Sequence, residues 1–128
     1  RRSTQKVSFV LDRPEEKVIA KISAPLFDWV IENLLKNALD AINGKGTITI
    51  KIKNFPSRVM IDVSDSGKGI SKQNINKVFK PGFTTKKRGW GLGLSLAKRI
   101  IEKYHSGQLF VKSSEIGKGT TFRIVLNT

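Results

Sequence analysis

The sequence predicts an α+β fold, a two-layer sandwich of one mixed, mostly antiparallel sheet with helices packed on one face. Segments that alternate between apolar and polar residues come in pairs joined by short turns, which is typical of β-hairpins. Two longer segments carry apolar residues at helical spacing. Because these helices do not alternate strictly with strands, a fully parallel sheet is not expected.

The N-terminal part predicts two strands and then a long helix. Residues 7–11 alternate, and residues 17–22 alternate again after a turn at Pro14. The helix begins after Ser23, a residue type that caps helices, and runs to a glycine-rich break at residues 44–46.

The remaining chain predicts two hairpins separated by helices. Residues 47–53 and 58–64 alternate and form the first pair of strands, followed by a short helix near residues 73–79. A second long helix is expected over residues 94–104, and it leads into two closing strands, 107–113 and 120–126.

Length and composition predict one globular domain that spans residues 1–128. The chain has no cysteine and a single histidine, His105, so disulfides and histidine–cysteine zinc sites are excluded. His105 is interpreted as a cation in the last turn of a helix. No apolar stretch approaches the roughly 20 residues of a membrane-spanning helix. Since the chain starts with Arg1 and shows no leader, we interpret it as a cytoplasmic domain excised from a longer protein.

The net charge of +14 is spread along the whole chain, with one tight run at residues 86–88. Aromatic residues make up 8% and do not interleave with that run, which argues against a nucleic-acid interface. The dispersion favours a solvated surface first, attraction of a nucleotide second and nucleic acid last.

The first helix carries a polar stripe that packing does not explain. At about 100° per residue, Asn33 and Asn37 line up at the border of an apolar arc, with Asp40 almost in line. Carboxamide oxygens are suitable ligands for Mg²⁺. The alternative, boundary asparagines that are merely tolerated, stays open. The arc itself consists of Phe27, Val30, Ile31, Leu34, Leu35, Ala38 and Ile42.

A predicted strand ends in Asp65, which is followed by Gly67 and Gly69. A carboxylate at a strand end can accept a hydrogen bond from an exocyclic amine such as that of adenine, and glycines allow the backbone to approach a flat ring. A plain Asp-Ser-Gly turn is the alternative.

A second glycine run, residues 89–93, stands directly before a helix, where backbone N–H groups can bind an anion. A flexible loop is the alternative here. Neither GxGxxG nor GxxxxGK[ST] occurs, so the Rossmann and P-loop classes lack their central motif.

Five segments together resemble the catalytic domain of histidine kinases, in the superfamily shared with gyrase, the mismatch-repair ATPases and a heat-shock chaperone. They occur in the family's order from about residue 23 to the C-terminus, and they look closest to nitrogen-regulator-type kinases. The resemblance implies the Bergerat fold, with a mobile lid over ATP. The matching segments are residues 32–41 (N box), 65–70 (first glycine box), 78–86 (phenylalanine box), 89–96 (second glycine box) and 117–122 (glycine–threonine strand start).

The resemblance implies ATP and Mg²⁺ as ligands. Asn37 would hold Mg²⁺, and Asp65 would bind the adenine amine, with Gly67 and Gly69 making room for the ring. Thr120 would contact water around the base. The implied catalytic residues are Asn33, Asn37 and Lys86, the last of which would reach the γ-phosphate from a lid at residues 79–93. The implied nucleotide-binding residues are Asn33, Lys36, Asn37, Asp40, Asp65, Gly67, Gly69, Ile70, Phe79, Thr84, Thr85, Lys86, Gly89, Gly91, Leu92, Gly93, Leu94 and Thr120.

One position favours a transferase over a hydrolase. The ATPases of this superfamily carry a water-activating glutamate four residues before the metal-binding asparagine, and this chain has Asn33 there. An amide cannot take a proton from water, and Glu32 points about 100° away. Transfer to a histidine is therefore expected. An ATPase, an anti-sigma serine kinase and a regulatory nucleotide-binding module remain alternatives, and a nucleic-acid binder comes last.

The same resemblance implies the partners. A histidine-bearing dimerisation domain of the same kinase would accept the phosphoryl group, and a response regulator would act downstream. The domain itself is expected to be monomeric, to contact neither nucleic acid nor membrane, and to be cytoplasmic even where the full sensor is membrane-bound.

Overall fold

A computed structural model describes residues 6–81 and 93–128 and confirms the predicted α+β sandwich. The strands are β1 (Lys6–Asp12), β2 (Lys45–Asn54), β3 (Arg58–Asp65), β4 (Gln108–Glu115) and β5 (Gly119–Asn127). They form one sheet in the order β1-β2-β3-β5-β4. β1 pairs with β2 in parallel, and the other neighbours are antiparallel, so the sheet is mixed and mostly antiparallel as expected.

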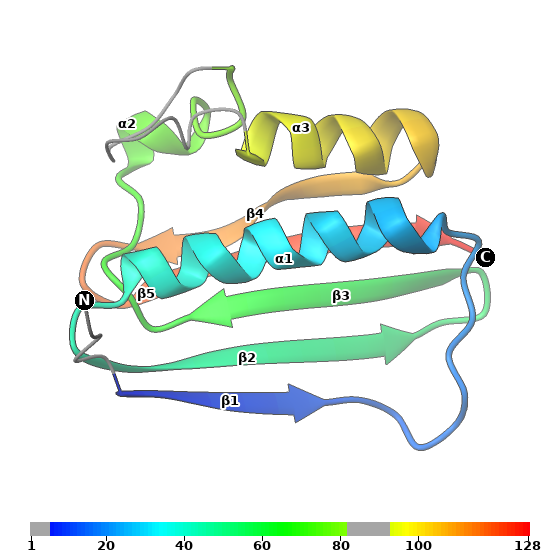
Figure 1. The fold of residues 1–128 in the computed structure, drawn as a ribbon, viewed down its shortest axis with the longest axis horizontal. Helices are drawn as coiled ribbons and strands as arrows, with labels where there is room; N and C mark the ends of the chain where they lie inside the picture. Colours follow the sequence, from blue (N-terminus) through cyan, green and yellow to red (C-terminus); the bar gives the residue numbers. More distant parts are fainter. Residues whose placement is uncertain (1–5, 82–92) are drawn as a thin grey trace.

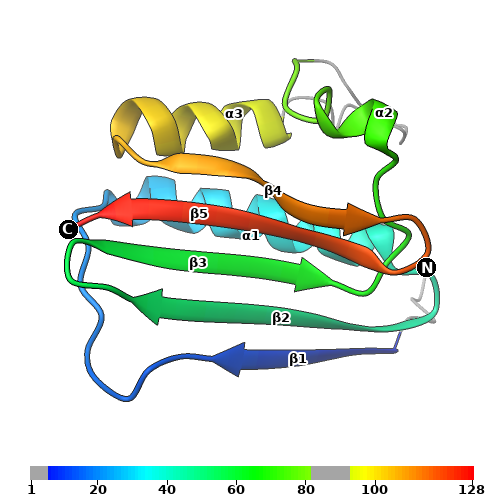
Figure 2. The ribbon, with the colours of Figure 1, turned by 180° about the vertical axis from the view of Figure 1, so that it is seen from behind.

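Two helical segments cover one face of this sheet. They are α1 (Ala24–Ala41) and α3 (Gly93–Arg99), and α3 continues into a π-helical stretch, Ile100–Tyr104. Figure 1 shows both over the same face, and Figure 2 shows that none of the described helices covers the other face. The short helix expected near residues 73–79 is a single turn, α2 (Lys72–Ile75), followed by further turns.

The apolar arc of α1 faces the sheet as its periodicity predicts. Val30, Leu34, Ala38 and Ile42 are buried, whereas the opposite side of the helix is exposed. Each buried Val, Leu or Ile contributes about 1.5–3 kcal/mol. The sheet supplies the other half of this core from alternating positions of β3 and β5, namely Val59, Ile61, Val63, Phe122, Ile124 and Leu126.

The strand predicted at residues 17–22 is wrong, because residues 13–23 connect β1 to α1 without entering the sheet. The alternation holds only in part: Val18 and Ala20 pack against the core and Ile19 is exposed, but Ile22 is exposed as well. However, the segment leaves the sheet edge for the helix layer, as Figure 1 shows, where no neighbouring strand can pair with it. The alternating pattern therefore indicated a half-buried segment and not a hydrogen-bonded strand.

The start of α1 is joined to the end of the π-helical stretch by His105. Ser23 occupies the N-cap position, but its hydroxyl makes no capping bond. Its backbone N–H donates to Nε2 of His105 at 3.0 Å, and Nδ1 of the same ring lies 3.0 Å from the carbonyl oxygen of Ile100. Since Nε2 accepts a hydrogen bond it carries no proton here, so the interpretation of His105 as a cation is wrong. The ring is a buried, neutral connector.

Candidate functional site

Asp65 is the last residue of β3, and its side chain is buried on the face that α1 covers. Its Oδ1 accepts a hydrogen bond from the backbone N–H of Gly67 at 2.8 Å. Burial raises the pKa of this carboxyl above its ordinary value, while hydrogen bonds from the backbone of Gly67 and Thr120 lower it. Burial outweighs these bonds, so a further hydrogen-bond donor would stabilise the ionised carboxylate. A ligand amine at this place would fit.

The turn after Asp65 is packed against two other parts of the chain. The backbone N–H of Lys68 donates to the carbonyl of Ala41 at 2.9 Å, and a Cβ on Gly67 would collide with that same carbonyl. A Cβ on Gly69, whose φ is +78°, would collide with the carbonyl of Glu115. This packing requires glycine at both positions. Their role in making room for a ring stays a prediction.

α1 brings the predicted asparagines to the same end of the sheet. Asn37 lies one turn before Ala41, where the turn after Asp65 docks, and Asn33 lies one turn further back. Both are half-buried, whereas Lys36 and Asp40 are exposed.

Asn33 also lies against the beginning of α3. Its Nδ2 donates to the carbonyl of Trp29 at 2.9 Å, and its Oδ1 is 2.8 Å from the place where a Cβ on Gly93 would stand. The polar edge of α1 therefore lies between the Asp65 turn and the start of α3. Leu94, in the first turn of α3, is half-buried and packs on the core.

Phe79 anchors the start of the predicted lid to the core. Its ring packs edge-to-face on Phe122, with the ring centroids 5.9 Å apart, and Nζ of Lys98 lies 4.7 Å from the Phe79 centroid. The other predicted lid residues lie outside the described residues, namely Thr84, Thr85, Lys86, Gly89, Gly91 and Leu92.

Thr120 stands opposite Asp65 on the neighbouring strand and is 5% exposed. Its Oγ1 lies 2.7 Å from Oγ of Ser114, a residue that sequence reasoning did not single out. Ser114 also accepts a hydrogen bond from the backbone N–H of Ile70 at 2.7 Å. The three polar residues Asp65, Ser114 and Thr120 line one pocket of about 270 Å³.

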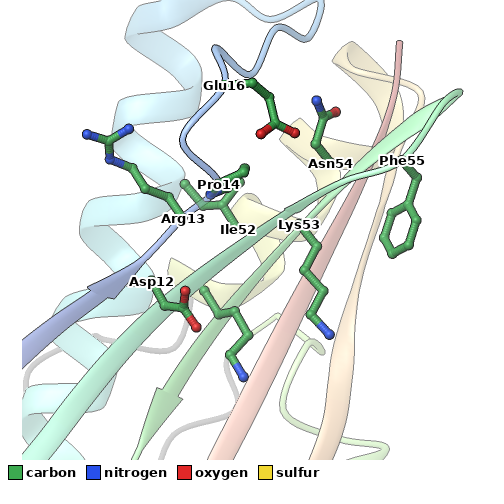
Figure 3. A pocket seen from close by; sticks show the side chains of 9 residues that line it. Asp12, Arg13, Pro14, Glu16, Ile52, Lys53, Asn54 and Phe55 are labelled. Atoms are coloured by element: carbon green, nitrogen blue, oxygen red, sulfur yellow. The ribbon is translucent and has the colours of Figure 1, made fainter.

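A different pocket, of about 390 Å³, lies at the opposite end of β2 (Figure 3). Both acidic and basic side chains line it, and none of the predicted site residues that the structure describes is among its lining residues. Its lining consists of Asp12, Arg13, Pro14, Glu16, Lys51, Ile52, Lys53, Asn54 and Phe55. The nucleotide site is therefore expected at the Asp65 end.

The described residues fit a nucleotide with its divalent ion better than a metal held by protein alone. Among them, no group of three histidine, cysteine, aspartate or glutamate side chains could hold a metal ion. Amide oxygens on the edge of α1 suit an ion that shares its ligands with phosphates and water. In the same residues no helix is long and apolar enough to cross a membrane.

A buried carboxylate at the end of a central strand, under a helix with an asparagine edge, is the arrangement that the sequence predicts for an ATP site. Residues 23–128 match the family of histidine kinase-, DNA gyrase B- and HSP90-like ATPases, and the chain belongs to this family. The predicted family, fold and ATP ligand are thus confirmed.

Similar proteins include a sensor histidine kinase and a sporulation kinase. Sensor histidine kinase ZraS of Salmonella typhi is 49% identical over 98 residues, which are 76% of this chain and 21% of ZraS. Sporulation kinase C of Bacillus subtilis is 38% identical over 97 residues, 76% of this chain and 22% of that kinase. The chain thus spans about a fifth of the length of these relatives.

Solved structures agree with this assignment. The catalytic domain of histidine kinase ThkA superposes with a TM-score of 0.84 at 30% identity, covering 94% of this chain and 80% of that one. ThkA in complex with the response regulator protein TrrA superposes with a TM-score of 0.80 at 28% identity, covering 94% of this chain and 34% of that one.

Proposed function

We propose that this chain is the ATP-binding catalytic part of a sensor histidine kinase, which donates the γ-phosphoryl group of Mg-ATP to a histidine on a separate dimerisation domain. In this mechanism Asp65 accepts a hydrogen bond from the adenine amine and so orients the base. Asn37, helped by Asn33, holds Mg²⁺, and the ion when bound neutralises charge on the phosphates. Lys36 and Lys86 add positive charge beside them.

The observation that carries this proposal is the amide at Asn33. Its Nδ2 already donates to the carbonyl of Trp29, and an amide cannot take a proton from a water molecule. The neighbouring Glu32 is exposed on the far side of α1. The domain would therefore position ATP and stabilise its charge, while the imidazole of the acceptor supplies the nucleophile.

Three further features belong to the proposal. Residues 1–128 act as a single, monomeric domain in the cytoplasmic part of the kinase, without contact to nucleic acid or membrane. A response regulator receives the phosphoryl group afterwards, as the complex of the relative ThkA with TrrA suggests. The acceptor histidine belongs to another domain, since His105 is buried and both of its ring nitrogens are engaged.

Calorimetric titration with Mg-ATP tests the site. We expect Asn37→Ala to lower the affinity by at least about 100-fold, since a metal ligand is lost, while circular dichroism shows the fold intact. Asn43→Ala is the matched control, because Asn43 is exposed just beyond α1, and it should bind normally. Normal affinity in Asn37→Ala would refute the metal role.

Phosphoryl transfer is tested separately with γ-labelled ATP and a histidine-bearing helical hairpin supplied in trans. Label on the hairpin supports the kinase. Steady ATP hydrolysis without any acceptor would instead indicate an ATPase, and binding without either reaction would indicate a regulatory module.

A further inference from the structure

β1 forms one edge of the sheet, and among the described strands it has a neighbour on one side only. The backbone N–H of Lys6 donates to the carbonyl of Gly44, directly before β2, at 2.7 Å. Backbone groups alternate in direction along a strand, so those of Val7, Phe9 and Leu11 point away from β2. These three residues therefore present hydrogen-bonding groups at the free edge.

This edge lacks the features that commonly prevent a strand from pairing with another chain. Such features are a proline, a bulge or a charged residue within the strand. The other edge strand, β4, has a bulge between Val111 and Ser113, next to Lys112. By contrast, β1 pairs with β2 in unbroken register, and its charged residues, Lys6 and Asp12, stand at its two ends. β1 is thus open to pairing along its length.

The side chains between these two charges are largely apolar and exposed. Phe9 and Leu11 are 61% and 59% exposed, and Val10 is 48% exposed. Phe9 pairs with Ile48, which is buried in the core, so the Phe9 ring is on the helix-bearing face and Val10 is on the other. Figures 1 and 2 show no described helix over β1. Apolar surface is therefore uncovered on both faces of this edge.

We propose that β1 pairs antiparallel with β1 of a second copy of this chain, centred on Phe9, and so joins the two sheets into one. The strand is complementary to itself in this register. Phe9 stands opposite its own equivalent, and Val7 stands opposite Leu11 of the second copy. Lys6 stands opposite Asp12 of the second copy, so opposite charges meet at both ends. A contact made by the same strand of both copies closes on two subunits.

Backbone and side chains favour the same register. With Phe9 at the centre, the outward N–H and C=O groups of each strand meet those of the other, as in an antiparallel ladder. Phe9 and Leu11 of both copies then pack together on the helix-bearing face. A shift by one residue would oppose outward-pointing and inward-pointing backbone groups. A shift by two residues would place Lys6 opposite Val10, or Asp12 opposite Ser8, and the charges would lose their partners.

The contact is small, and it is therefore transient. Two strands of seven residues bury less than the roughly 1,200 Å² of a stable interface. Two copies with a net charge of +14 also repel each other, so the dilute domain stays monomeric. Copies held together in a dimeric kinase reach effective concentrations on the order of 1 mM, at which the edges can pair. Only this setting rests on the proposed function, since the pairing itself requires no nucleotide.

Disulfide formation tests the register, because the chain has no cysteine of its own. In the proposed register, Ser8 of one copy stands opposite Val10 of the other, with the Cα atoms about 4.5 Å apart, which suits a disulfide. We expect a mixture of Ser8→Cys and Val10→Cys to form linked heterodimers at least about tenfold faster than either variant forms homodimers, whose cysteines would be about 7–8 Å apart. Mass spectrometry measures both products.

Two results of this experiment would overturn the inference. One is that heterodimers and homodimers form at equal rates, which would indicate random collision. The other is that a cysteine-bearing histidine hairpin, added to the mixture, captures Ser8→Cys in place of Val10→Cys, which would assign the edge to a different partner.

Charge reversal gives an independent test that leaves Phe9 in place. Lys6→Asp and Asp12→Lys each put like charges opposite each other at both ends, and each should weaken self-association about tenfold in sedimentation equilibrium. The double variant Lys6→Asp/Asp12→Lys restores opposite charges and should recover the association. If net charge alone mattered, the two single variants would shift association in opposite directions. That outcome, or a lack of any association by the unmodified domain at on the order of 1 mM, would refute the pairing while leaving nucleotide binding untouched.

Discussion

Asp65 illustrates at the residue scale how a binding group can oppose folding. Burial raises the pKa of its carboxyl above the ordinary value, so the folded state disfavours the ionised form. This destabilisation is present at pH values above the folded pKa and vanishes below the ordinary pKa. The nucleotide-free domain therefore bears a cost that a donor from the ligand would offset.

We accordingly expect Asp65→Asn to raise the thermal stability of the nucleotide-free domain at neutral pH and to lower its affinity for ATP. The advantage should shrink as the pH falls and the native carboxyl becomes protonated. Thermal unfolding at neutral pH and near pH 4 measures the gain in stability and its dependence on pH. Asp12→Asn, at an exposed aspartate, should show no such pattern. A less stable Asp65→Asn at neutral pH would contradict the argument.

The other buried aspartate has a structural partner. Asp62 alternates along β3 with the core residues Ile61 and Val63, so its side chain lies on the other face of the sheet. Arg123 donates to both of its oxygens at 2.8 and 2.9 Å. The two side chains are only 11% and 19% exposed, because each shields the other from water. Such a pair contributes little net energy when intact but costs much when one partner is removed.

Arg123→Ala should therefore lower the free energy of unfolding by about 2–3 kcal/mol, because Asp62 remains half-enclosed without a donor. The comparison is Lys118→Ala, whose pair with Glu115 is 3.8 Å long and exposed on both sides. That change should cost less than about 0.5 kcal/mol. Urea denaturation of both variants measures the two losses in the free energy of unfolding. Equal losses would show that burial of the ion pair does not increase its contribution to stability.

At the scale of elements, His105 ties the first turn of α1 to the last turn of the helical stretch after α3. Removing the ring leaves the N–H of Ser23 and the carbonyl of Ile100 without this partner. We expect His105→Ala to destabilise the domain by about 2–3 kcal/mol, through two lost hydrogen bonds and a cavity.

Hydrogen exchange localises this effect. The amides of Ser23 and Phe27 should exchange faster in His105→Ala, because the start of α1 frays first. Tyr104→Ala is a suitable control, since the neighbouring Tyr104 side chain is 69% exposed. Uniformly faster exchange over all strands would instead point to a global loss of stability.

The helices and hairpins could be predicted because their periodicity is local. The path of residues 13–23 could not, since burial of alternate residues does not reveal whether a strand lies alongside. In the site, Asp65 and the asparagines stood out as polar residues at the edges of apolar patterns. Ser114 did not: counting by twos from Leu109 and Val111 puts Ser113 on the inner face, and only the bulge reverses this.

At the scale of the whole molecule, positive charge is in large excess over negative charge. Lysine and arginine number 24 against 10 aspartate and glutamate, which gives a net charge of +14. A field of this sign attracts polyanions from a distance, and salt screens it beyond a Debye length of about 10 Å at 0.1 M. Its effect should therefore appear in the rate of nucleotide association more than in the contacts of the bound state.

Stopped-flow measurements with increasing salt separate these two contributions. Between about 20 and 200 mM NaCl, we expect the association rate constant of ATP to fall on the order of fivefold, with a much smaller change in the dissociation rate. Adenosine is the matched control, because it carries the same base without phosphate charge and should associate at a rate independent of salt. If ATP and adenosine responded alike, the net charge would have no part in nucleotide capture. If dissociation carried the salt effect instead, direct phosphate contacts within the site would dominate over the field of the whole domain.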